Sequence, residues 1–446
     1  MIRVAVVLLI LDGIADRPWP LLGGRTPLEA ADTPNLDRFA SLGQTGLLHP
    51  LGRGMAPGSE ISHFVLFGYP AEAFPGRAAF EALGEGIELT GDEVVFRGLF
   101  STVEKREDGT LLVLRRRTPV PDDECRALAE SIPRFERGGI CVEFQYNSQH
   151  QGIVFVRGAS HATLVAPSAD VTDSDPYVAG RSVTKVEPLA DADEPYDARA
   201  TSEALNAWLA SVYQALETHP VNAARRARGE EPANFLLVKW SARYSPLPAF
   251  AEVSGLRGAS VSSGVTYRGL ARGLGLDWYG VDYLADWTED LGMRLRTART
   301  ALDEGHEFVH VHTKAPDEAG HTKDPARKRD VVAALDAALS ALWEEGLVDE
   351  ANLVIVTGDH GTPSGTDLVH SGDPVPFAML GPSTYPDAVT AFDERSCAAG
   401  SLGHLEGRDV LPMALNAIGR IKYMTAKLTP AGGIWWPNAT EPLRID

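Results

Sequence analysis

Residues 352–374 read NLVIVTGDHGTPSGTDLVHSGDP, and this stretch indicates the type of fold. A short apolar run ends just before Asp359 and His360, and His370 follows ten residues later in a loop rich in Gly, Pro, Ser and Thr. Loops at the ends of buried strands are where α/β proteins hold their functional residues, and Asp and His are both metal-ligand types. The stretch therefore predicts one part of a metal site at the end of a strand.

Similar apolar runs alternate with helical patterns at both ends of the chain. Strands are predicted at residues 4–11, 235–238, 308–311 and 353–356. A Thr-Pro pair opens a helical pattern at residues 33–41, and Asp324-Pro325 precedes a longer one at residues 326–345. This alternation predicts an α/β fold with a mostly parallel sheet and helices on both faces.

The middle of the chain follows a different pattern. From about residue 94 to residue 166, short segments with alternating apolar residues are separated by Gly, Asp and Pro, which is typical of an antiparallel sheet. We expect an inserted α+β domain at residues 91–186, within a core made of residues 1–90 and 187–446. The acidic, irregular stretch at residues 189–198 is the expected return linker.

Composition limits the classes of partner. The chain has 446 residues and a net charge of −20, so nucleic acid and anionic membranes are poor partners, and no run reaches the roughly 18–20 apolar residues of a membrane span. Its three cysteines (Cys125, Cys141, Cys397) share no metal-type spacing and indicate a reducing compartment. The apolar N-terminal run stops at Asp12 without a cleavage site. We expect a cytoplasmic protein, and the sequence leaves a homo-oligomer open.

Three separate segments place Asp or His just after a predicted strand. Because the carboxyl ends of neighbouring parallel strands meet at one edge of a sheet, these side chains are expected to converge. The candidate ligands are Asp12, Asp317, His321, Asp359, His360 and His370. Six oxygen and imidazole ligands suit two cations rather than one, and they favour Zn²⁺ or Mn²⁺. Paired cations about 3.5–4 Å apart are the usual arrangement for displacement at phosphorus.

Ser59 is the candidate nucleophile. Gly58 and Ser59 precede a segment that can begin a helix, where free backbone N–H groups suit a phosphate. Taken singly, Ser59 is better explained as a helix cap, Asp12-Gly13 as a turn and His370 as a solvated histidine. The ordered set of four segments is what favours a catalytic site.

The chain resembles the alkaline phosphatase superfamily and, within it, the archaeal-type cofactor-independent (2,3-bisphosphoglycerate-independent) phosphoglycerate mutases. The matching blocks are DGIADRPWPLLGGRTPLEAADTPNLDRFASLGQTG (12–46), PGSEISHFVLFGYP (57–70), EALGEGIEL (81–89), HPVN (219–222), KAPDEAGH (314–321), TGDHGTP (357–363), HSGDPVP (370–376) and SLGHLEGRDVLPMALNAIGR (401–420). The resemblance implies interconversion of 3- and 2-phosphoglycerate, with the inserted domain acting as a cap over the substrate.

The resemblance also implies a role for each matching residue. One divalent ion, Mn²⁺ or Zn²⁺, would be held by Asp12, Ser59, Asp359 and His360. The other would be held by Asp317, His321 and His370. Ser59 would attack the phosphorus atom and form a phosphoserine, and Lys314 would contact the phosphoryl group or the substrate.

The departures from the family pattern fall on the substrate side. Lys239-Trp240 stands where the family usually has Arg-Gly, and an Arg run that includes Arg116 replaces a longer Arg-rich motif. Lys does not reproduce the bidentate geometry of Arg, and Trp adds bulk, so we expect a remodelled pocket. The candidate substrate-binding residues are Lys239, Trp240, His150, Arg115, Arg116, Asp173, Asp175 and Arg268.

Three function classes follow from these patterns. The first is a two-metal phosphotransferase acting on a small phosphorylated metabolite. The second is a hydrolase with the same centre: a phosphatase, a phosphodiesterase or a phosphonate-processing enzyme. The third is a binding or regulatory protein that keeps the fold without turnover.

Overall fold

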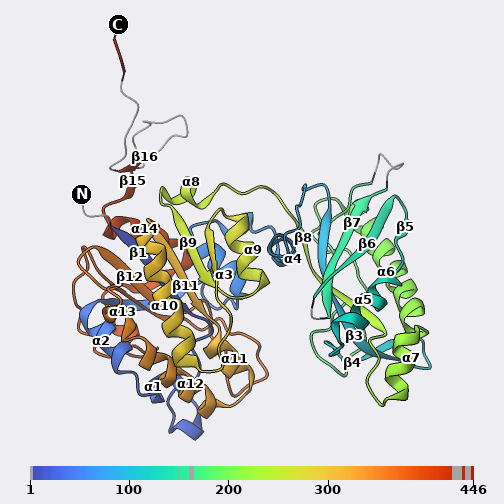
Figure 1. Cartoon of the computed structure of the whole chain (residues 1–446), viewed down its shortest axis with the longest axis horizontal. Helices are drawn as coiled ribbons and strands as arrows, with labels where there is room; N and C mark the ends of the chain where they lie inside the picture. The colour runs from blue at the N-terminus through green and yellow to red at the C-terminus, as the bar shows by residue number, and fades with distance from the viewer. Residues whose placement is uncertain (1–3, 149, 160–164, 424–433, 437–442, 446) are drawn as a thin grey trace. The chain divides into compact units, whose positions relative to one another are not determined.

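The computed structural model describes residues 4–148, 150–159, 165–423, 434–436 and 443–445. The chain forms two compact units (Figure 1). The first consists of Met1–Phe74 and Leu247–Asp446, and the second of Pro75–Pro246. Within the described part of the chain, every helix falls short of the length or the apolar content that a membrane span requires.

An eight-stranded, mostly parallel sheet forms the centre of the first unit. Its strands, in spatial order, are β10 (Asp277–Gly280), β9 (Gly258–Ser262), β11 (Phe308–Thr313), β1 (Ala5–Leu11), β12 (Asn352–Thr357), β13 (Val375–Leu380), β2 (Gln44–His49) and β14 (Gly403–Glu406). All neighbouring pairs are parallel except those that β13 makes with β12 and β2. The sequence-based prediction of a mostly parallel α/β sheet is confirmed.

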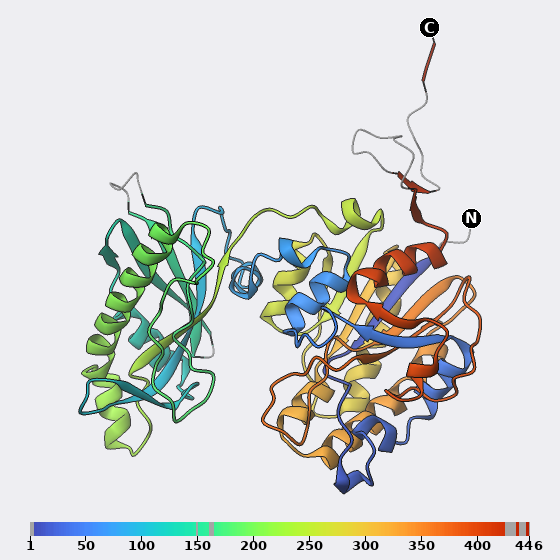
Figure 2. The same ribbon diagram turned by 180° about the vertical axis from the view of Figure 1, so that it is seen from behind.

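Helices cover both faces of this sheet because the side chains of each strand alternate between the faces. Val309 and Val311 of β11 pack with Leu295 of α10 and Val331 of α12. Phe308 lies on the opposite face, 5.7 Å between ring centroids from Phe67 at the end of α3. The α10 and α12 layer faces the viewer in Figure 1, and the α3 and α14 layer does so in Figure 2.

Side-chain caps begin some of the helices of the first unit. They are α1 (Pro27–Ala30), α2 (Pro34–Leu42), α3 (Ser59–Leu66), α8 (Phe250–Ser254), α9 (Val265–Gly273), α10 (Trp287–Asp303), α11 (Ala315–His321), α12 (Pro325–Ala338), α13 (Ala341–Glu344) and α14 (Gly407–Ala417). The Asp324 side chain accepts hydrogen bonds from the N–H groups of Ala326 and Arg327 and so begins α12. The predicted helix at residues 326–345 is two helices, α12 and α13, separated at Leu339 and Ser340.

The second unit contains the predicted antiparallel sheet. Its strands are β4 (Leu111–Arg115), β3 (Val94–Lys105), β7 (Gln151–Gly158), β6 (Ile140–Ser148) and β5 (Phe135–Arg137), and β8 (Phe235–Arg243) also pairs with β3. Its helices are α4 (Arg77–Gly84), α5 (Asp122–Glu130), α6 (Pro195–Glu217) and α7 (Pro220–Ala227). Trp208 of α6 packs on one sheet face, and Ala82 of α4 packs on the other.

The second unit is longer than the predicted insert at residues 91–186. The placement of the strand at 235–238 in the parallel sheet is wrong: these residues begin β8, which pairs antiparallel with β3. The helix α6 begins at Pro195, inside the expected linker, and buries Leu205 and Trp208 against the same sheet. A short apolar run predicts a strand but not its partner, because pairing depends on distant residues.

Candidate active site

Three neighbouring strands bring the candidate ligands to one edge of the first sheet. In the sheet, β1 lies between β11 and β12 and runs parallel to both. Asp12 follows β1, Lys314 follows β11, and Asp359 follows β12 by two residues. All three therefore lie at the carboxyl edge of the sheet, where α/β folds place their sites.

The first group of ligand atoms surrounds the Nε2 atom of His360. Asp12 Oδ1 lies 3.3 Å from it, and Asp359 Oδ2 lies 3.4 Å from it. The Ser59 hydroxyl lies 3.0 Å from the same nitrogen. All four side chains are buried. One atom from each of Asp12, Asp359 and His360 lies within 4.8 Å of the other two, an arrangement that could hold a metal ion.

Two buried carboxylate oxygens make this group fit a cation. Neither Asp12 Oδ1 nor Asp359 Oδ2 has a hydrogen-bond partner, which is costly for a buried polar atom. The other oxygen of Asp359 accepts a hydrogen bond of 3.0 Å from the N–H of Gly13. Tetrahedral coordination with bonds of about 2.0–2.1 Å spaces its ligand atoms about 3.3 Å apart. The spacing of the donors around His360 matches this value.

Gly13 is required by this packing. Its backbone has a φ of +66°, and a Cβ atom there would lie 2.5 Å from the hydroxyl of Thr362. Thr362 in turn donates a hydrogen bond of 2.7 Å to Asp317. The turn after β1 therefore connects the loop of Asp359 with the helix that carries Asp317.

The second group of ligand atoms forms around Asp317. His321 Nε2 lies 3.2 Å from Asp317 Oδ1, and His370 Nε2 lies 3.5 Å from the same oxygen. The atoms within 4.8 Å of one another belong to Asp317, His360 and His370. The rings of His360 and His370 stack with centroids 3.6 Å apart. His360 thus stands between the two groups, whereas His321 contacts Asp317 from its more exposed side.

The charges of the site are strongly coupled. Burial and the nearby charge of Asp12 raise the pKa of Asp359 to about 7. Burial would also raise the pKa of Asp12, but the ammonium of Lys314 and the hydrogen bond with His312 outweigh it and lower that pKa. Lys314 Nζ lies 3.4 Å from Asp12 and 3.0 Å from Asp317, so one cation balances two carboxylates.

Ser59 is the first residue of α3, and its position is fixed from several sides. The N–H groups of the first helical turn have no partners within the helix, so they suit an anion. His63, one turn later, contacts the carbonyl oxygen of Ser59 at 2.7 Å. Ser62 donates a hydrogen bond of 2.5 Å to the carbonyl oxygen of Asp359. The nucleophile candidate and the Asp359 loop are therefore joined directly.

A cluster in the second unit contains most of the candidate substrate-binding residues. Arg116 holds Asp175 with two hydrogen bonds of 2.7 and 2.6 Å, and Lys239 lies 3.1 Å from the same carboxylate. The N–H of Trp240 donates to Asp173 at 2.8 Å. The Trp240 ring lies 4.0 Å from both the Lys239 ammonium and the Arg77 guanidinium. We call this set, together with the neighbouring Tyr177 and His150, the cap cluster.

Three residues of the cap cluster have unusual backbones. His150, Tyr177 and Trp240 all have φ values near +60°, a region that non-glycine residues rarely adopt. The Tyr177 ring lies against the cationic groups of Arg116 and Lys239. Burial is the main reason why the pKa of His150 is lowered, and the positive charges of Arg117 and Arg97 lower it further. Strained backbone tends to gather at functional sites.

Two candidate residues lie outside the cap cluster. Arg115 forms an exposed ion pair with Glu231 on the surface of the second unit. Arg268 belongs to α9 in the first unit, with its guanidinium 5.5 Å from the Trp278 ring. Conversely, Arg97 and Arg117 accompany the cap cluster. Arg117 belongs to the Arg run noted in the sequence, whereas the position of Arg97 gave no sign of it.

Sequence reasoning also missed Tyr267 and His312, which both contact Asp12. His312 lies in the pattern FVHVH, whose alternation predicts that His310 and His312 share one strand face. Tyr267 has no such signal, because its partner lies 255 positions away in the sequence.

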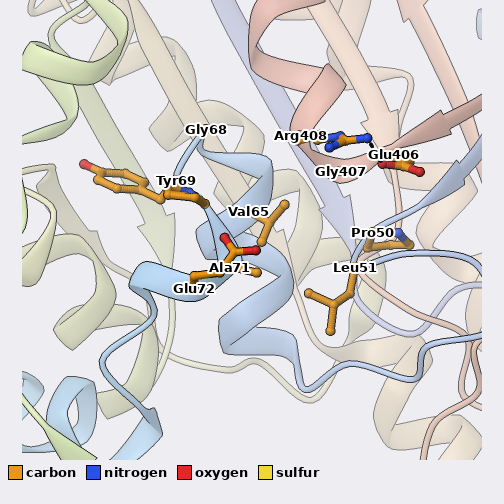
Figure 3. Close-up of a pocket in the computed structure, with 11 residues that line it drawn as sticks. Pro50, Leu51, Val65, Gly68, Tyr69, Ala71, Glu72, Glu406, Gly407 and Arg408 are labelled. Carbon is orange, nitrogen blue, oxygen red and sulfur yellow. Dashed lines mark ion pairs between the residues drawn. The ribbon is translucent and has the colours of Figure 1, made fainter.

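A separate pocket lies elsewhere in the first unit (Figure 3). It has a volume of about 330 Å³ and is lined by residues around the end of α3 and the start of α14, among them Val65, Tyr69, Glu406 and Arg408. None of the candidate ligand residues lines it.

Comparison with known proteins identifies the family. The family model described as 2,3-bisphosphoglycerate-independent phosphoglycerate mutase matches residues 40–222. A protein of that name from Methanopyrus kandleri is 37% identical over 94% of this chain and 97% of its own length. A second, from Methanocaldococcus jannaschii, is 35% identical over 92% of each chain.

Solved structures agree with the sequence comparison. The PH0037 protein of Pyrococcus horikoshii has a TM-score of 0.72 at 27% identity, covering 94% of this chain and 98% of its own. The cofactor-independent phosphoglycerate mutase of Thermoplasma acidophilum has a TM-score of 0.61 at 30% identity, covering 93% of this chain and 100% of its own.

Fold and relatives together define this chain as an α/β isomerase. Within that class, the chain belongs to the family of 2,3-bisphosphoglycerate-independent phosphoglycerate mutases.

Proposed function

We propose that this chain transfers a phosphoryl group through Ser59 and thereby interconverts 3- and 2-phosphoglycerate. The observation that carries the proposal is the convergence of four side chains. The Ser59 hydroxyl, one Asp12 oxygen and one Asp359 oxygen all lie 3.0–3.4 Å from the Nε2 atom of His360. Relatives named 2,3-bisphosphoglycerate-independent phosphoglycerate mutase align along almost the whole chain, and they support the choice of phosphoglycerate as the substrate.

Two divalent ions, Mn²⁺ or Zn²⁺, would supply electrostatic stabilisation of the phosphoryl group and favour ionisation of the nucleophile. We assign Asp12, Ser59, Asp359 and His360 to one ion. We assign Asp317, His321 and His370 to the other.

The chain's own residues perform the remaining steps. Ser59 Oγ attacks phosphorus while the bond between phosphorus and the substrate oxygen breaks, and the departing oxygen takes up the proton that the serine hydroxyl releases. The group is then held as a phosphoserine at the start of α3, where the unpaired backbone N–H groups of a first helical turn suit an anion. Lys314, which lies between Asp12 and Asp317, contacts the phosphoryl oxygens and balances their charge. The phosphoryl group then returns to the other hydroxyl of the glycerate.

Recognition of the substrate's second anionic group is assigned to the cap cluster. Cationic side chains outnumber carboxylates there: Arg77, Arg97, Arg116, Arg117 and Lys239 accompany Glu81, Asp173 and Asp175. A carboxylate or phosphate would use that excess charge. His150 and Trp240 border the same groups.

A hydrolytic function is the second candidate, and one observation favours it. Asp175 already occupies both Arg116 and Lys239, and the Trp240 ring fills space beside Lys239. If these contacts persist with substrate, recognition of a glycerate carboxylate would be weakened and another phosphorylated compound would be the substrate.

One experiment distinguishes these outcomes. Phosphorus NMR would follow 3-phosphoglycerate with the Mn²⁺-loaded protein and with its Ser59→Ala variant. Appearance of 2-phosphoglycerate that depends on Ser59 supports the mutase, and Ser59-dependent release of phosphate supports the hydrolase. Conversion that survives in Ser59→Ala contradicts both.

We also propose a cytoplasmic location, because the three cysteines are free and buried, as expected in a reducing compartment. Fractionation of the native cells with an antibody to the chain would test it, and recovery outside the cytoplasm would contradict it.

A further inference from the structure

The two oxygens of the Asp12 carboxylate have different surroundings. Three donors converge on Oδ2: His312 Nε2 at 2.9 Å, the Tyr267 hydroxyl at 3.1 Å and Lys314 Nζ at 3.4 Å. Oδ1 is buried, has no hydrogen-bond partner and lies 3.3 Å from His360 Nε2. Rotation of the carboxylate by half a turn would exchange these two environments.

The donors therefore select one orientation. An ionised carboxylate can only accept, so the His312 nitrogen that faces it carries the proton. Three hydrogen bonds to a single charged acceptor hold it in place, because hydrogen bonds to charged groups are stronger than those between neutral groups. The oxygen left free is the one that faces the other ligands of the first group.

Tyr267 is placed to hold this orientation firmly. It projects from α9, is almost fully buried, and its ring lies 3.9 Å between centroids from the ring of His312. Its ring also contacts the His63 ring edge to face, with centroids 5.1 Å apart and an interplanar angle of 66°. The phenol donates its proton to Asp12 because an ionised carboxylate can only accept.

The strand end that carries His312 is itself held in place. Arg294 of α10 is fully buried and donates a hydrogen bond of 3.1 Å to the carbonyl oxygen of His312. Two further bonds of 2.6 and 3.0 Å connect Arg294 to Asp290 on the same helix. The His312 ring therefore meets Asp12 from a rigid support.

We propose that Tyr267, together with His312, is a positioning residue that keeps Asp12 Oδ1 directed toward a bound cation. Both residues act through Asp12 and not on the substrate. The inference rests on the two-ion site of the proposed function. Groups that orient a metal ligand typically change metal affinity 10- to 100-fold when removed, and this is the expected effect of removing the Tyr267 hydroxyl.

The experiment is a titration of the metal-free protein with Mn²⁺. Binding is measured by calorimetry and, independently, by the paramagnetic resonance signal of the free ion. The wild-type chain is expected to bind two equivalents. Tyr267→Phe keeps the ring on His312 and removes only the hydroxyl. We expect one of its two equivalents to bind 10- to 100-fold more weakly. Tyr69→Phe is the matched control: Tyr69 is buried in the same unit and donates to the Pro248 carbonyl at 2.8 Å. It should bind both ions as the wild type does.

A second pair of variants separates positioning from general damage to the fold. His312→Gln keeps a side-chain donor near the position of Nε2, whereas His312→Leu does not. Weaker Mn²⁺ binding in the Leu variant than in the Gln variant supports the inference. This comparison remains informative if the Tyr267→Phe protein proves unstable. Equal affinities in this pair, or wild-type affinity in a folded Tyr267→Phe protein, overturn it. A wild-type chain that binds fewer than two ions overturns the two-ion site and the inference together.

Discussion

The hydroxyl of Ser59 and the Nε2 atom of His360 lie 3.0 Å apart although 301 positions separate them in the sequence. Ser59 begins α3, and His360 follows β12, so the contact joins a helix start to a strand end. Both side chains are buried, and Asp12 and Asp359 lie beside them.

Ser59 should become labelled during turnover. Protein quenched in acid after a short exposure to substrate should carry one phosphoryl group on the peptide that contains Ser59, as measured by mass spectrometry. Ser59→Ala should lose the label and at least about 10³-fold in turnover, because no other hydroxyl takes its place as nucleophile. Ser41→Ala removes an exposed serine of α2 and should retain both. A label on another residue would contradict the assignment.

Lys314→Met should have opposite effects on turnover and on metal binding. Lys314 balances Asp12 and Asp317 at 3.4 and 3.0 Å. Without this charge, Mn²⁺ should bind at least about tenfold more tightly, because removal of a nearby like charge outweighs the loss of one of the three donors to Asp12 Oδ2, of which His312 and Tyr267 remain. Phosphoryl transfer should fall about 10²- to 10³-fold. Calorimetric titration and steady-state kinetics check the two parts.

Lys314→Arg is the matched control, because it keeps the charge and should bind Mn²⁺ close to the wild-type affinity. Weaker binding in the Met variant would contradict the electrostatic argument.

Lys239 should make the stability of the chain depend on pH. Burial lowers its pKa to about 8, against the attraction of Asp175, while the unfolded chain has the ordinary value of 10.5. The folded state therefore binds this proton less tightly, so the cost of a buried ammonium is fully present below pH 8 and is relieved as the pH rises toward 10.5. The unfolding free energy of the wild type, minus that of Lys239→Met, should rise by about 2 kcal/mol between pH 7.5 and pH 10.

Urea unfolding at four pH values measures that difference. Arg116 continues to pair Asp175 in the variant, so the carboxylate is not left alone. A difference that stays flat or falls with pH would show that Lys239 is not desolvated in the folded state.

Trp240 should report backbone strain. Its φ of +60° suits glycine and disfavours any residue with a Cβ. Trp240→Gly and Trp240→Ala both lose the ring and its contacts with Arg77 and Lys239, but only Gly also loses the strain. Thermal unfolding should therefore find the Gly variant more stable than the Ala variant by about 1 kcal/mol.

The same pair at Leu114, an exposed residue of β4 without positive φ, provides the control. At position 114 the Ala variant should be the more stable of the two, because glycine there relieves no strain and only increases the conformational entropy of the unfolded chain. Equal stabilities at position 240 would mean that the left-handed backbone costs nothing.

The fold class could be predicted from the sequence because the patterns that indicate strands and helices are local. Apolar runs such as Asn352–Thr357 and caps such as Asp324 act within a few residues, so they predict elements without knowledge of partners. The strand β8 shows where this stops. Its residues predict a strand, but its pairing with β3 depends on contacts 140 positions away, as between Gly98 and Val238.

The same division applies to the site. Asp12, Asp359 and His360 lie one to three residues after a strand, and Asp317 lies in the first turn of the helix after β11, so their place at the sheet edge follows from the sequence alone. Tyr267 and the pairing of Asp175 with Lys239 could not be predicted, because no periodicity connects such distant residues.

The sequence by itself determined which residue types stand at the ends of which strands, and therefore the chemistry available to this chain. The tertiary structure decided which of those atoms are free. Asp12 Oδ1 and Asp359 Oδ2 are unpaired only because His312, Tyr267 and Gly13 engage the opposite oxygens, and that choice depends on packing across hundreds of residues.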